Sequence, residues 1–309
     1  MSETLKSAEQ IASDSLTTSL LNLVNQINWL KEQIKINLYL RNGRKPWSRG
    51  YSIFKKNFIT QSLDDPALVK LFEENLKLPD RYGEFLDDRV VEFPWLISRL
   101  NKENGTILDA GSALNFDWIL QHAKISDKDI TIVTLEPERN CYWQNRVSYL
   151  FGDLRNLPIK DNWFDEIVSI STIEHIGMNN SIYSSDSKYV EQNNLDYLKV
   201  ISELKRVTKP GGKVYITVPY GKYTDFGWYQ QFNGEMIDAI IETFEPAKLT
   251  ETYYCYEFGG WSIGDKQYCQ KFEGFNIRDT KYFNPHSNKD YDLDRAAASR
   301  AVAALELWK

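Results

Sequence analysis

The sequence predicts an α/β protein built on a doubly wound, mostly parallel sheet, and three observations support this fold class. From residue 105 onward, short apolar runs alternate with amphipathic stretches, as strands and their covering helices do in such a sheet. Glycine or acidic residues directly follow several of these runs, where the loops of a parallel sheet diverge around a ligand. A helical pattern occupies the N-terminal region instead. We therefore expect a helical extension over residues 1–104 and the sheet domain over residues 105–309.

The N-terminal residues 1–45 have the spacing of a helix. Their apolar residues recur every three or four positions and share one helix face: Leu20, Leu21, Val24, Ile27, Leu30, Ile34 and Leu38. Lys31, Glu32 and Lys35 interrupt the run, so we do not expect stable insertion into a membrane. We expect this helix to dock on protein, with a homodimer through the helix or loose membrane attachment as alternatives.

The region up to the first strand is mixed in character. Residues 46–104 carry Pro66, Pro79 and Pro94, and the stretch 87–95 leads into a predicted helix over residues 96–100.

Five apolar runs have the length and composition of buried strands. They are residues 106–110, 130–135, 147–151, 164–170 and 213–218. Helices are predicted between them, over residues 114–124 and 189–207. Pro210 and Gly211 suit a type II turn that connects the second of these helices to the fifth strand.

Aromatic residues are concentrated in the C-terminal third. Beyond Pro219 the chain is rich in Tyr and Gly, and aromatic rings form flat platforms for sugars and heterocycles. We therefore expect residues 220–291 to be an aromatic-rich insertion on the substrate side. In residues 296–308, alanine favours a helix, whereas the position after a long excursion favours a last strand.

Composition limits the classes of partner and compartment. The net charge of −6 argues against a general nucleic-acid binder, which needs clustered Lys and Arg. The three cysteines and three histidines form no zinc pattern, so no metal site is expected, and few cysteines suit a reducing compartment. No signal-peptide pattern opens the chain and no apolar run reaches ~18 residues, so we expect a cytoplasmic protein.

The loops after the first three predicted strands contain candidate ligands for an adenosine-containing cofactor. Gly111 permits a tight turn and close approach of a ligand, and Asp109 can accept a hydrogen bond from a cationic amino group. Glu136, at the tip of the second strand, can hold the two hydroxyls of a ribose. Asp153 can accept from the adenine amino group. Each residue read alone also fits an ordinary loop position.

In chain order, these segments resemble the class I S-adenosylmethionine-dependent methyltransferases, especially the type 11 branch. The resemblance covers about residues 104–220, and its most specific pieces are Phe164–Val168 and Lys209–Gly212. It implies a Rossmann-like, seven-stranded sheet whose last strand is antiparallel. It also implies S-adenosyl-L-methionine as cofactor, with a cofactor site that contains Asp109, Gly111, Ser112, Glu136, Asp153, Leu154 and Ser171.

The resemblance narrows further at three places. The stretch 87–100, the turn 109–115 and the terminal residues 304–309 are similar to methyltransferases found with polysaccharide and lipopolysaccharide genes. We therefore expect a small-molecule or glycan acceptor, with a sugar hydroxyl as the methylated group. The chain departs from the family in its glycine-rich turn, where Gly111 alone remains of three glycines.

Transfer of a methyl group to a hydroxyl needs positioning and a base. His175 follows the fourth strand and titrates near neutral pH when unperturbed, so it is our candidate base, with Glu174 as the second. A histidine that packs beneath the loop is the alternative reading. We expect the acceptor to contact four residues after the fifth strand, each of which also fits a packing role: Tyr220, Tyr223, Asp225 and Trp228.

Two other functions stay open. An NAD(P)-dependent oxidoreductase or epimerase would share the sheet, but the sequence lacks G-x-G-x-x-G, and the Tyr51…Lys55 pair precedes the first strand. A methyltransferase-like protein without activity, serving in binding or assembly, would be consistent with the missing glycines.

Overall fold

The chain forms two compact units. The computed structural model describes residues 8–101, 103–281, 283–284 and 286–309. One unit is Met1–Asn57 and the other is Phe58–Lys309. The boundary between units therefore lies earlier than the predicted one between residues 104 and 105, because the helices before the first strand belong to the larger unit. No helix among the described residues is long and apolar enough to cross a membrane.

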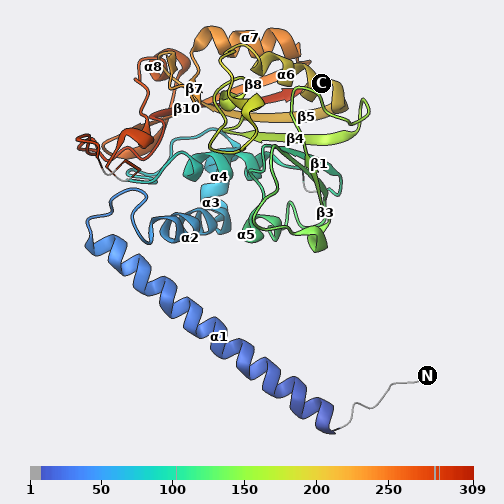
Figure 1. The fold of residues 1–309 in the computed structure, drawn as a ribbon, viewed down its shortest axis with the longest axis vertical. Helices are drawn as coiled ribbons and strands as arrows, with labels where there is room; N and C mark the ends of the chain where they lie inside the picture. Colours follow the sequence, from blue (N-terminus) through green and yellow to red (C-terminus); the bar gives the residue numbers. More distant parts are fainter. Residues whose placement is uncertain (1–7, 102, 282, 285) are drawn as a thin grey trace. The chain divides into compact units, whose positions relative to one another are not determined.

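The smaller unit consists of α1 (Ala8–Arg41) and the first half of α2 (Tyr51–Asp64) (Figure 1). The ring of Tyr39 is buried and packs edge-on against Tyr51, with 5.8 Å between ring centroids. Gly50 has a φ of +99°, and a Cβ there would lie 2.1 Å from the carbonyl oxygen of Lys35, so the connecting loop needs glycine at this point. The predicted helix is confirmed over Ala8–Arg41, while residues 1–7 and the side chain of Leu21 lie outside the described residues.

The larger unit is built on one eight-stranded sheet with the order β3-β2-β1-β4-β5-β10-β8-β9 (Figure 1). Strands β1 to β5 are parallel, and β10 runs antiparallel to both of its neighbours. The bounds are β1 Thr106–Ala110, β2 Asp129–Thr134, β3 Val147–Phe151, β4 Phe164–Ile170, β5 Thr208–Pro219, β8 Lys248–Glu257, β9 Gly260–Gly264 and β10 Ala301–Trp308. A separate hairpin pairs β6 (Thr224–Asp225) with β7 (Gln230–Gln231).

This sheet confirms a mostly parallel architecture and corrects two predictions. Seven strands were expected, but β9 adds an eighth at the edge. Residues 220–291 were expected to be an insertion, yet this range supplies β8 and β9 of the main sheet and the helix α7 (Gly234–Phe244). The C-terminal residues, left open between helix and strand, form the antiparallel strand β10.

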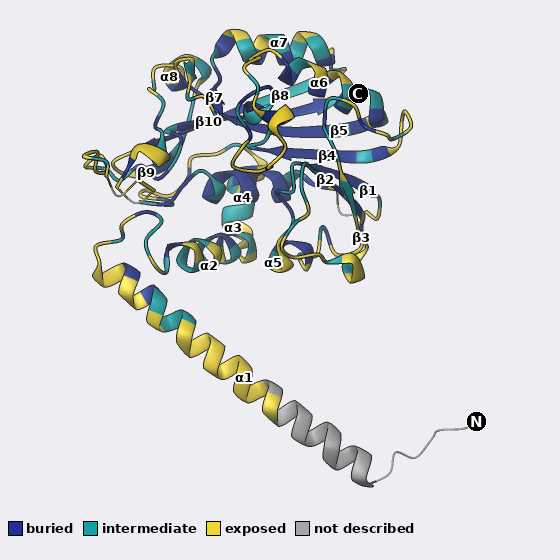
Figure 2. Cartoon of the chain, in the orientation of Figure 1, coloured by how far each residue is buried: buried dark blue, intermediate teal, exposed yellow. Residues whose placement is uncertain are grey.

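Helices cover both faces of the sheet (Figures 1 and 2). On one face α6 (Tyr197–Val207) and α7 pack against the apolar side of β5, where Val214, Ile216 and Val218 alternate with the residues of the other side. On the opposite face lies α4 (Arg89–Arg99), whose Trp95 packs edge-on against Tyr215. α4 in turn contacts α3 (Pro66–Glu73). Since successive residues of a strand point to opposite faces, both faces of β5 are buried from Val214 to Pro219.

Three elements differ from prediction, two of them at side-chain hydrogen bonds and one through strand pairing. α5 (Asp117–Leu120) is shorter than predicted, since Asp109 already holds the N–H of Leu114. α6 begins later than predicted, after a loop tied by the Asn193–Asp196 hydrogen bond. The predicted turn at Pro210 is a bulge inside β5, because pairing passes from Phe164↔Thr208 to Glu166↔Lys213.

Short elements complete the larger unit. They are the 3₁₀ helices η1 (Trp143–Asn145), η2 (Ile173–His175), η3 (Ser187–Tyr189) and η4 (Ile277–Asp279), and the helix α8 (Lys266–Cys269).

A buried ion pair joins β4 to the loop before β2. Lys128 contacts Glu166, and both residues are almost completely buried. Glu166 also accepts hydrogen bonds from the N–H of Asn101 and the hydroxyl of Tyr215.

We expect Lys128→Met to reduce the free energy of unfolding by about 3–5 kcal/mol, because it leaves a buried carboxylate without its cation. Urea denaturation checks this; the double variant Lys128→Met/Glu166→Gln should recover part of the loss, and equal stability of the wild-type and single-variant proteins would contradict it.

Candidate functional site

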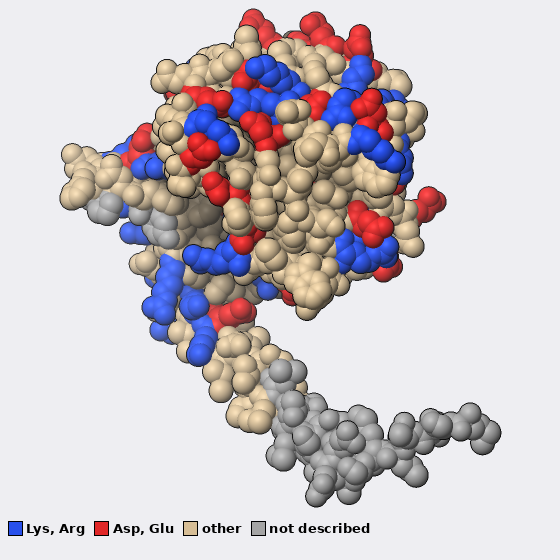
Figure 3. Space-filling model, turned by 45° about the vertical axis from the view of Figure 1, so that its right-hand side comes forward, with Lys and Arg blue, Asp and Glu red and all other residues tan. Residues whose placement is uncertain are grey.

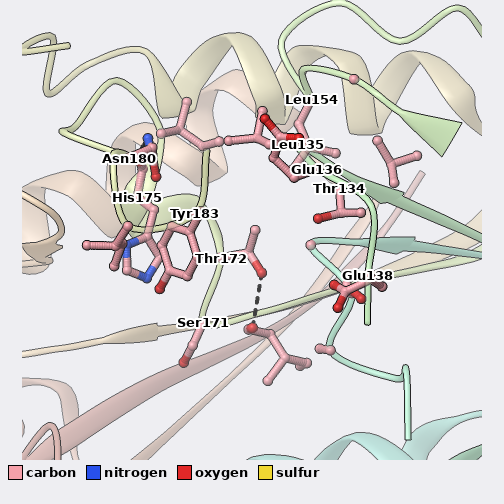
Figure 4. A pocket seen from close by; sticks show the side chains of 18 of the residues that line it. Thr134, Leu135, Glu136, Glu138, Leu154, Ser171, Thr172, His175, Asn180 and Tyr183 are labelled. Atoms are coloured by element: carbon pink, nitrogen blue, oxygen red, sulfur yellow. Dashed lines mark hydrogen bonds between the residues drawn. The ribbon is translucent and has the colours of Figure 1, made fainter. Parts of the chain in front are cut away.

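A cavity of about 460 Å³ lies at the carboxyl ends of the parallel strands. The loops after β1, β2, β3 and β4 line it, together with the first turns of α4 and the segment Asn180–Tyr183 (Figure 4). Crevices of this kind form at the carboxyl edge, where adjacent loops leave in opposite directions. Of the predicted site residues, the cavity brings together Gly111, Ser112, Glu136, Leu154, Ser171 and His175.

The side chain of Asp109 fixes the loop after β1 through hydrogen bonds to the backbone of that loop. The carboxylate is buried and accepts hydrogen bonds from the backbone N–H groups of Ala113, at 3.0 Å, and Leu114, at 2.7 Å. Burial raises the pKa of Asp109 to about 7, although these two N–H groups act to lower it. Asp109 does not line the cavity, so the structure gives it a role in holding the loop in place of the predicted direct contact with the cofactor.

Gly111 is required by its surroundings. Its φ is +120°, and a Cβ at this position would lie 2.1 Å from Oγ1 of Thr172. The loops after β1 and β4 can therefore approach each other only when residue 111 has no side chain.

We expect Gly111→Ala to lower the free energy of unfolding by about 2 kcal/mol or more, because the new methyl group strains both the backbone and Thr172. Urea denaturation measures the effect. Gly152→Ala is the matched control, because a Cβ at residue 152 would meet no atom within 4 Å. Equal stability of the two variants would show that the loops relax freely.

Ser112 leaves a polar atom without a partner. Its Oγ is buried, lines the cavity and has no hydrogen-bond partner among the described residues. Buried hydroxyls without partners are rare, so this atom is available to a ligand.

Two carboxylates follow β2, Glu136 and Glu138, and both line the cavity. Glu136 accepts a 2.6 Å hydrogen bond from the hydroxyl of Ser184, which belongs to the loop between β4 and α6. In Figure 4 the rings of His175 and Tyr183 lie together, away from Glu138. Glu136, the acid predicted at the tip of the second strand, thus lines the cavity, and the Ser184 hydroxyl donates a hydrogen bond to it.

Asp153, after β3, faces Arg155 and is not part of the cavity lining. Its carboxylate accepts hydrogen bonds from Nε and Nη2 of Arg155, at 3.0 Å and 2.6 Å. Partial burial acts to raise the pKa of Asp153, but the hydrogen bonds from Arg155 hold it below its usual range. Arg155 also contacts Glu191 and Asp196, so these residues tie two loops together. Gly152 and Leu154 take the places on the cavity wall instead.

His175 is held in a defined tautomer. Its Nδ1 lies 2.8 Å from the backbone oxygen of Trp228, and since a carbonyl oxygen only accepts, Nδ1 carries the proton. Nε2 therefore has a free lone pair. Burial lowers the pKa of His175 to about 4, and the nearby Arg89 also lowers it, so the ring is neutral at neutral pH. A neutral imidazole with an open Nε2 can accept a proton.

Glu174 lies next to His175, and its Oε1 is 3.9 Å from Nε2 of the histidine ring. The residue is buried and does not line the cavity, and Oε2 has no hydrogen-bond partner among the described residues. Burial, together with the neighbouring carboxylates of Glu92 and Asp88, holds the pKa of Glu174 well above its usual value. A raised pKa favours the protonated form of Glu174, which disfavours it as a base.

A hydrogen-bond network connects α4 to the cavity through Glu92. This buried carboxylate accepts from the hydroxyls of Ser171 and Thr217, both at 2.6 Å, and from Nη1 of Arg89 at 2.7 Å. Arg89 is the single cationic side chain of the cavity wall among the described residues. Its Nη1 also donates to the carbonyl oxygen of Ile170, at 3.4 Å, which places the guanidinium beside the end of β4.

The structure separates the four residues predicted to contact the acceptor, and none of them lines the cavity. Tyr220 is fully buried, and its hydroxyl donates to the carbonyl oxygen of Lys266, so it is a core residue. Tyr223 and Asp225 lie at the exposed β6–β7 hairpin, where Asp225 accepts from the N–H of Gly227. Trp228 comes nearest, because its ring packs on His175 with 5.3 Å between centroids.

Arg89, Tyr183 and Ser184 were not predicted from sequence. Residues 87–92 contain several charged residues at the start of an apolar helical run, and this was a signal for Arg89. A cation at the start of a buried helix is rare unless it has a partner or a ligand. Tyr183 and Ser184 lie on a long connection, and only the fold reveals that its tip returns to the cavity. Among the described residues, no group of three or more His, Cys, Asp or Glu side chains could hold a metal ion.

Comparison with known proteins finds a match to a methyltransferase family in this part of the chain. Residues 108–216, about a third of the chain, match the family described as methyltransferase domain. A malonyl-[acyl-carrier protein] O-methyltransferase of Buchnera aphidicola subsp. Baizongia pistaciae is 27% identical over 180 residues. The alignment covers 50% of this chain and 65% of that relative, so the chain spans less than two thirds of the relative's length.

Solved structures of methyltransferases are also similar to the chain. The phosphoethanolamine N-methyltransferase 2 of Haemonchus contortus shares 16% identity at a TM-score of 0.42, over 82% of this chain and 60% of that one. The 1,6-didemethyltoxoflavin-N1-methyltransferase of Burkholderia thailandensis shares 13% identity at a TM-score of 0.41, over 84% and 88%. The match of residues 108–216 supports methyltransferase activity, with S-adenosylmethionine as the cofactor.

Proposed function

We propose, from the match of residues 108–216 to the methyltransferase domain, that the cavity binds S-adenosylmethionine and that His175 assists methyl transfer to a hydroxyl of a small polar acceptor. The choice of a hydroxyl as the methyl acceptor rests on the tautomer of His175. Its Nδ1–H donates to the backbone oxygen of Trp228, and its Nε2 is open to accept a proton. The cavity is formed within residues 89–183 of one chain.

The residues of the cavity fit the cofactor. Glu136 can accept from both ribose hydroxyls, and the unpartnered Oγ of Ser112 can donate to a polar group of the ligand. Arg89, the cation of the wall, is placed to hold the carboxylate of the methionine part. The backbone at Gly111 leaves room where a Cβ would collide, and the cavity volume of about 460 Å³ lies in the range of cofactor sites.

The bound cofactor supplies an activated methyl group on a sulfonium. The chain then has to orient the acceptor and take up one proton, because the hydroxyl loses its hydrogen as its oxygen gains the methyl group. Nε2 of His175 accepts this proton, and the positive charge that develops lies next to the backbone oxygen of Trp228 and near Glu174.

For the acceptor we propose a sugar hydroxyl, in a nucleotide sugar or glycan of polysaccharide biosynthesis in the cytoplasm. The aromatic ring of Tyr183, which lines the cavity beside His175, is suited to stack on a sugar ring. A carboxylate oxygen is the second candidate acceptor, since the Buchnera relative is named for O-methylation of a malonyl group. A carboxylate acceptor would need no base, because it carries no proton at neutral pH.

Calorimetric titration with S-adenosylhomocysteine, with NAD⁺ and NADP⁺ as controls, tests the cofactor site. We expect saturable binding of S-adenosylhomocysteine alone, followed by methyl transfer to members of a panel of nucleotide sugars and glycans. Binding of a nicotinamide cofactor would overturn the proposal. Binding of S-adenosylhomocysteine without turnover on any sugar or carboxylate acceptor would favour a non-catalytic binding or assembly role.

A further inference from the structure

The smaller unit exposes an apolar stripe on α1. The stripe consists of Leu20, Leu23, Val24, Ile27, Leu30, Ile34 and Leu38, whose exposed fractions range from 41% for Ile27 to 62% for Leu20. Their spacing of three and four residues places them along one face of the helix. The other apolar face is already used within this unit, where Ile36 and Tyr39 are buried and Tyr39 contacts Tyr51 and Phe54.

The same unit is strongly basic, in contrast to the rest of the chain. Residues 31–57, the basic segment, contain eight Lys and Arg residues and one acidic residue, Glu32, whereas the whole chain has a net charge of −6. Five of these cations are exposed: Lys31, Arg41, Lys45, Arg49 and Lys56. Figure 3 shows Lys and Arg side chains gathered at the C-terminal end of α1, next to uncharged helix surface.

An apolar stripe beside a cluster of cations fits the interface of an anionic membrane. The acyl region takes up the stripe, while the cations pair with negatively charged headgroups. The stripe extends over 19 residues, or about 27 Å of helix, and would lie in the plane of the surface. No described helix could span the membrane, so the attachment is peripheral.

A second copy of the chain fits this surface less well. Leu20, Leu23, Ile27, Leu30 and Ile34 do follow a heptad spacing, with the flanking positions occupied by residues such as Val24, Gln26, Lys31 and Gln33. These flanking residues offer no pairs of opposite charge. Parallel pairing would also bring two copies of the basic segment together, and like charges repel.

We propose that the apolar stripe and the basic segment together form a docking surface for anionic phospholipid. The test is flotation of the full chain with phosphatidylcholine vesicles, with and without one third phosphatidylglycerol. We expect the protein to float with the anionic vesicles, to stay behind with the neutral ones, and to be released by high salt, which screens the headgroup charge.

Two double variants separate the contributions of charge and apolar surface. Lys45→Glu/Arg49→Glu removes exposed cations outside the helices, and Leu30→Ser/Ile34→Ser removes part of the stripe without changing charge. We expect each to weaken vesicle binding by at least about tenfold. Lys70→Glu/Lys77→Glu, two exposed lysines of the larger unit, is the matched control and should bind like the wild type. Circular dichroism and thermal unfolding establish that each variant is folded.

Three outcomes would overturn the proposal. The first is that the folded wild-type chain does not float with anionic vesicles. The second is an equal loss of binding in the control variant, which would indicate attraction by any surface lysine. The third is a dimer in light scattering that the Leu30→Ser/Ile34→Ser variant dissociates, together with no vesicle binding, which would assign the stripe to a second copy. None of these measurements depends on methyltransferase activity.

Discussion

Replacing His175 with alanine should lower turnover on the hydroxyl acceptor by about 10²–10⁴-fold and leave the affinity for S-adenosylhomocysteine nearly unchanged. The reason is that Nε2 of the neutral ring accepts the proton, and alanine offers no acceptor at that position. Steady-state kinetics and calorimetry on the same preparation separate the two effects.

The pH profile gives a second readout. The pKa of His175 is lowered to about 4, so the ring is neutral, and active as a base, at every pH above that value. Activity should therefore stay level as the pH falls from 8 to about 5, and decline as protonation fills Nε2 near pH 4. A base with an unperturbed pKa would already lose activity below about pH 6.5.

Tyr183→Phe is the control for His175→Ala, since it keeps the ring that packs on His175 and removes a hydroxyl alone. It should retain most of the turnover. Undiminished turnover of the His175→Ala variant would exclude His175 as the base. With a carboxylate acceptor that result is expected, so the variant also distinguishes the two acceptor classes.

Glu136→Ala should weaken S-adenosylhomocysteine binding about a hundredfold or more, with little change in the free energy of unfolding. Two hydrogen bonds from ribose hydroxyls to one carboxylate are lost, and hydrogen bonds to charged groups contribute about 1.5–3 kcal/mol each. The side chain is partly exposed and accepts a hydrogen bond from the hydroxyl of Ser184, so we do not expect the fold to depend on it. Calorimetry measures the affinity and urea denaturation the stability.

Glu138→Ala is the matched control, because it removes a carboxylate of the same cavity two residues away. It should change the affinity much less. Ser184→Ala adds a sharper comparison: Ser184 and the ribose hydroxyls would use the same carboxylate oxygen, so its removal should not weaken binding. Equal affinities of the wild-type and Glu136→Ala proteins would remove Glu136 from the site.

The parallel strands β1 to β4 could be predicted from the sequence, because buried parallel strands are short, continuous apolar runs. Four of the five predicted strands match β1 to β4 within one residue at each end. The fifth was predicted too short, since Pro210 and Gly211 suggested a turn, whereas the glycines permit a bulge that keeps the chain in β5. β8 and β9 were both missed, because they lie in the range predicted to be an insertion, and Trp261 of β9 lies among glycines and residues typical of a loop.

The site could be predicted in position but not in the direction of its side chains. Sequence placed acidic residues after three strands, and Glu136 does face the cavity. Asp109 and Asp153 do not, because backbone N–H groups in one case and Arg155 in the other occupy their carboxylates. The aromatic residues after β5 were assigned to the acceptor as a group, yet Tyr220 is buried between β5 and α8, and position in the chain gave no sign of this.

The strand β10 has a consequence for how the protein folds during synthesis. It lies between β5 and β8 and pairs with both, although it follows every other strand of the sheet in the chain. Until residues 301–308 leave the ribosome, β5 and β8 each present an unpaired edge, and unpaired edges are sites of aggregation. We therefore expect the nascent chain to depend on chaperones for the interval between the appearance of β8 and the insertion of β10.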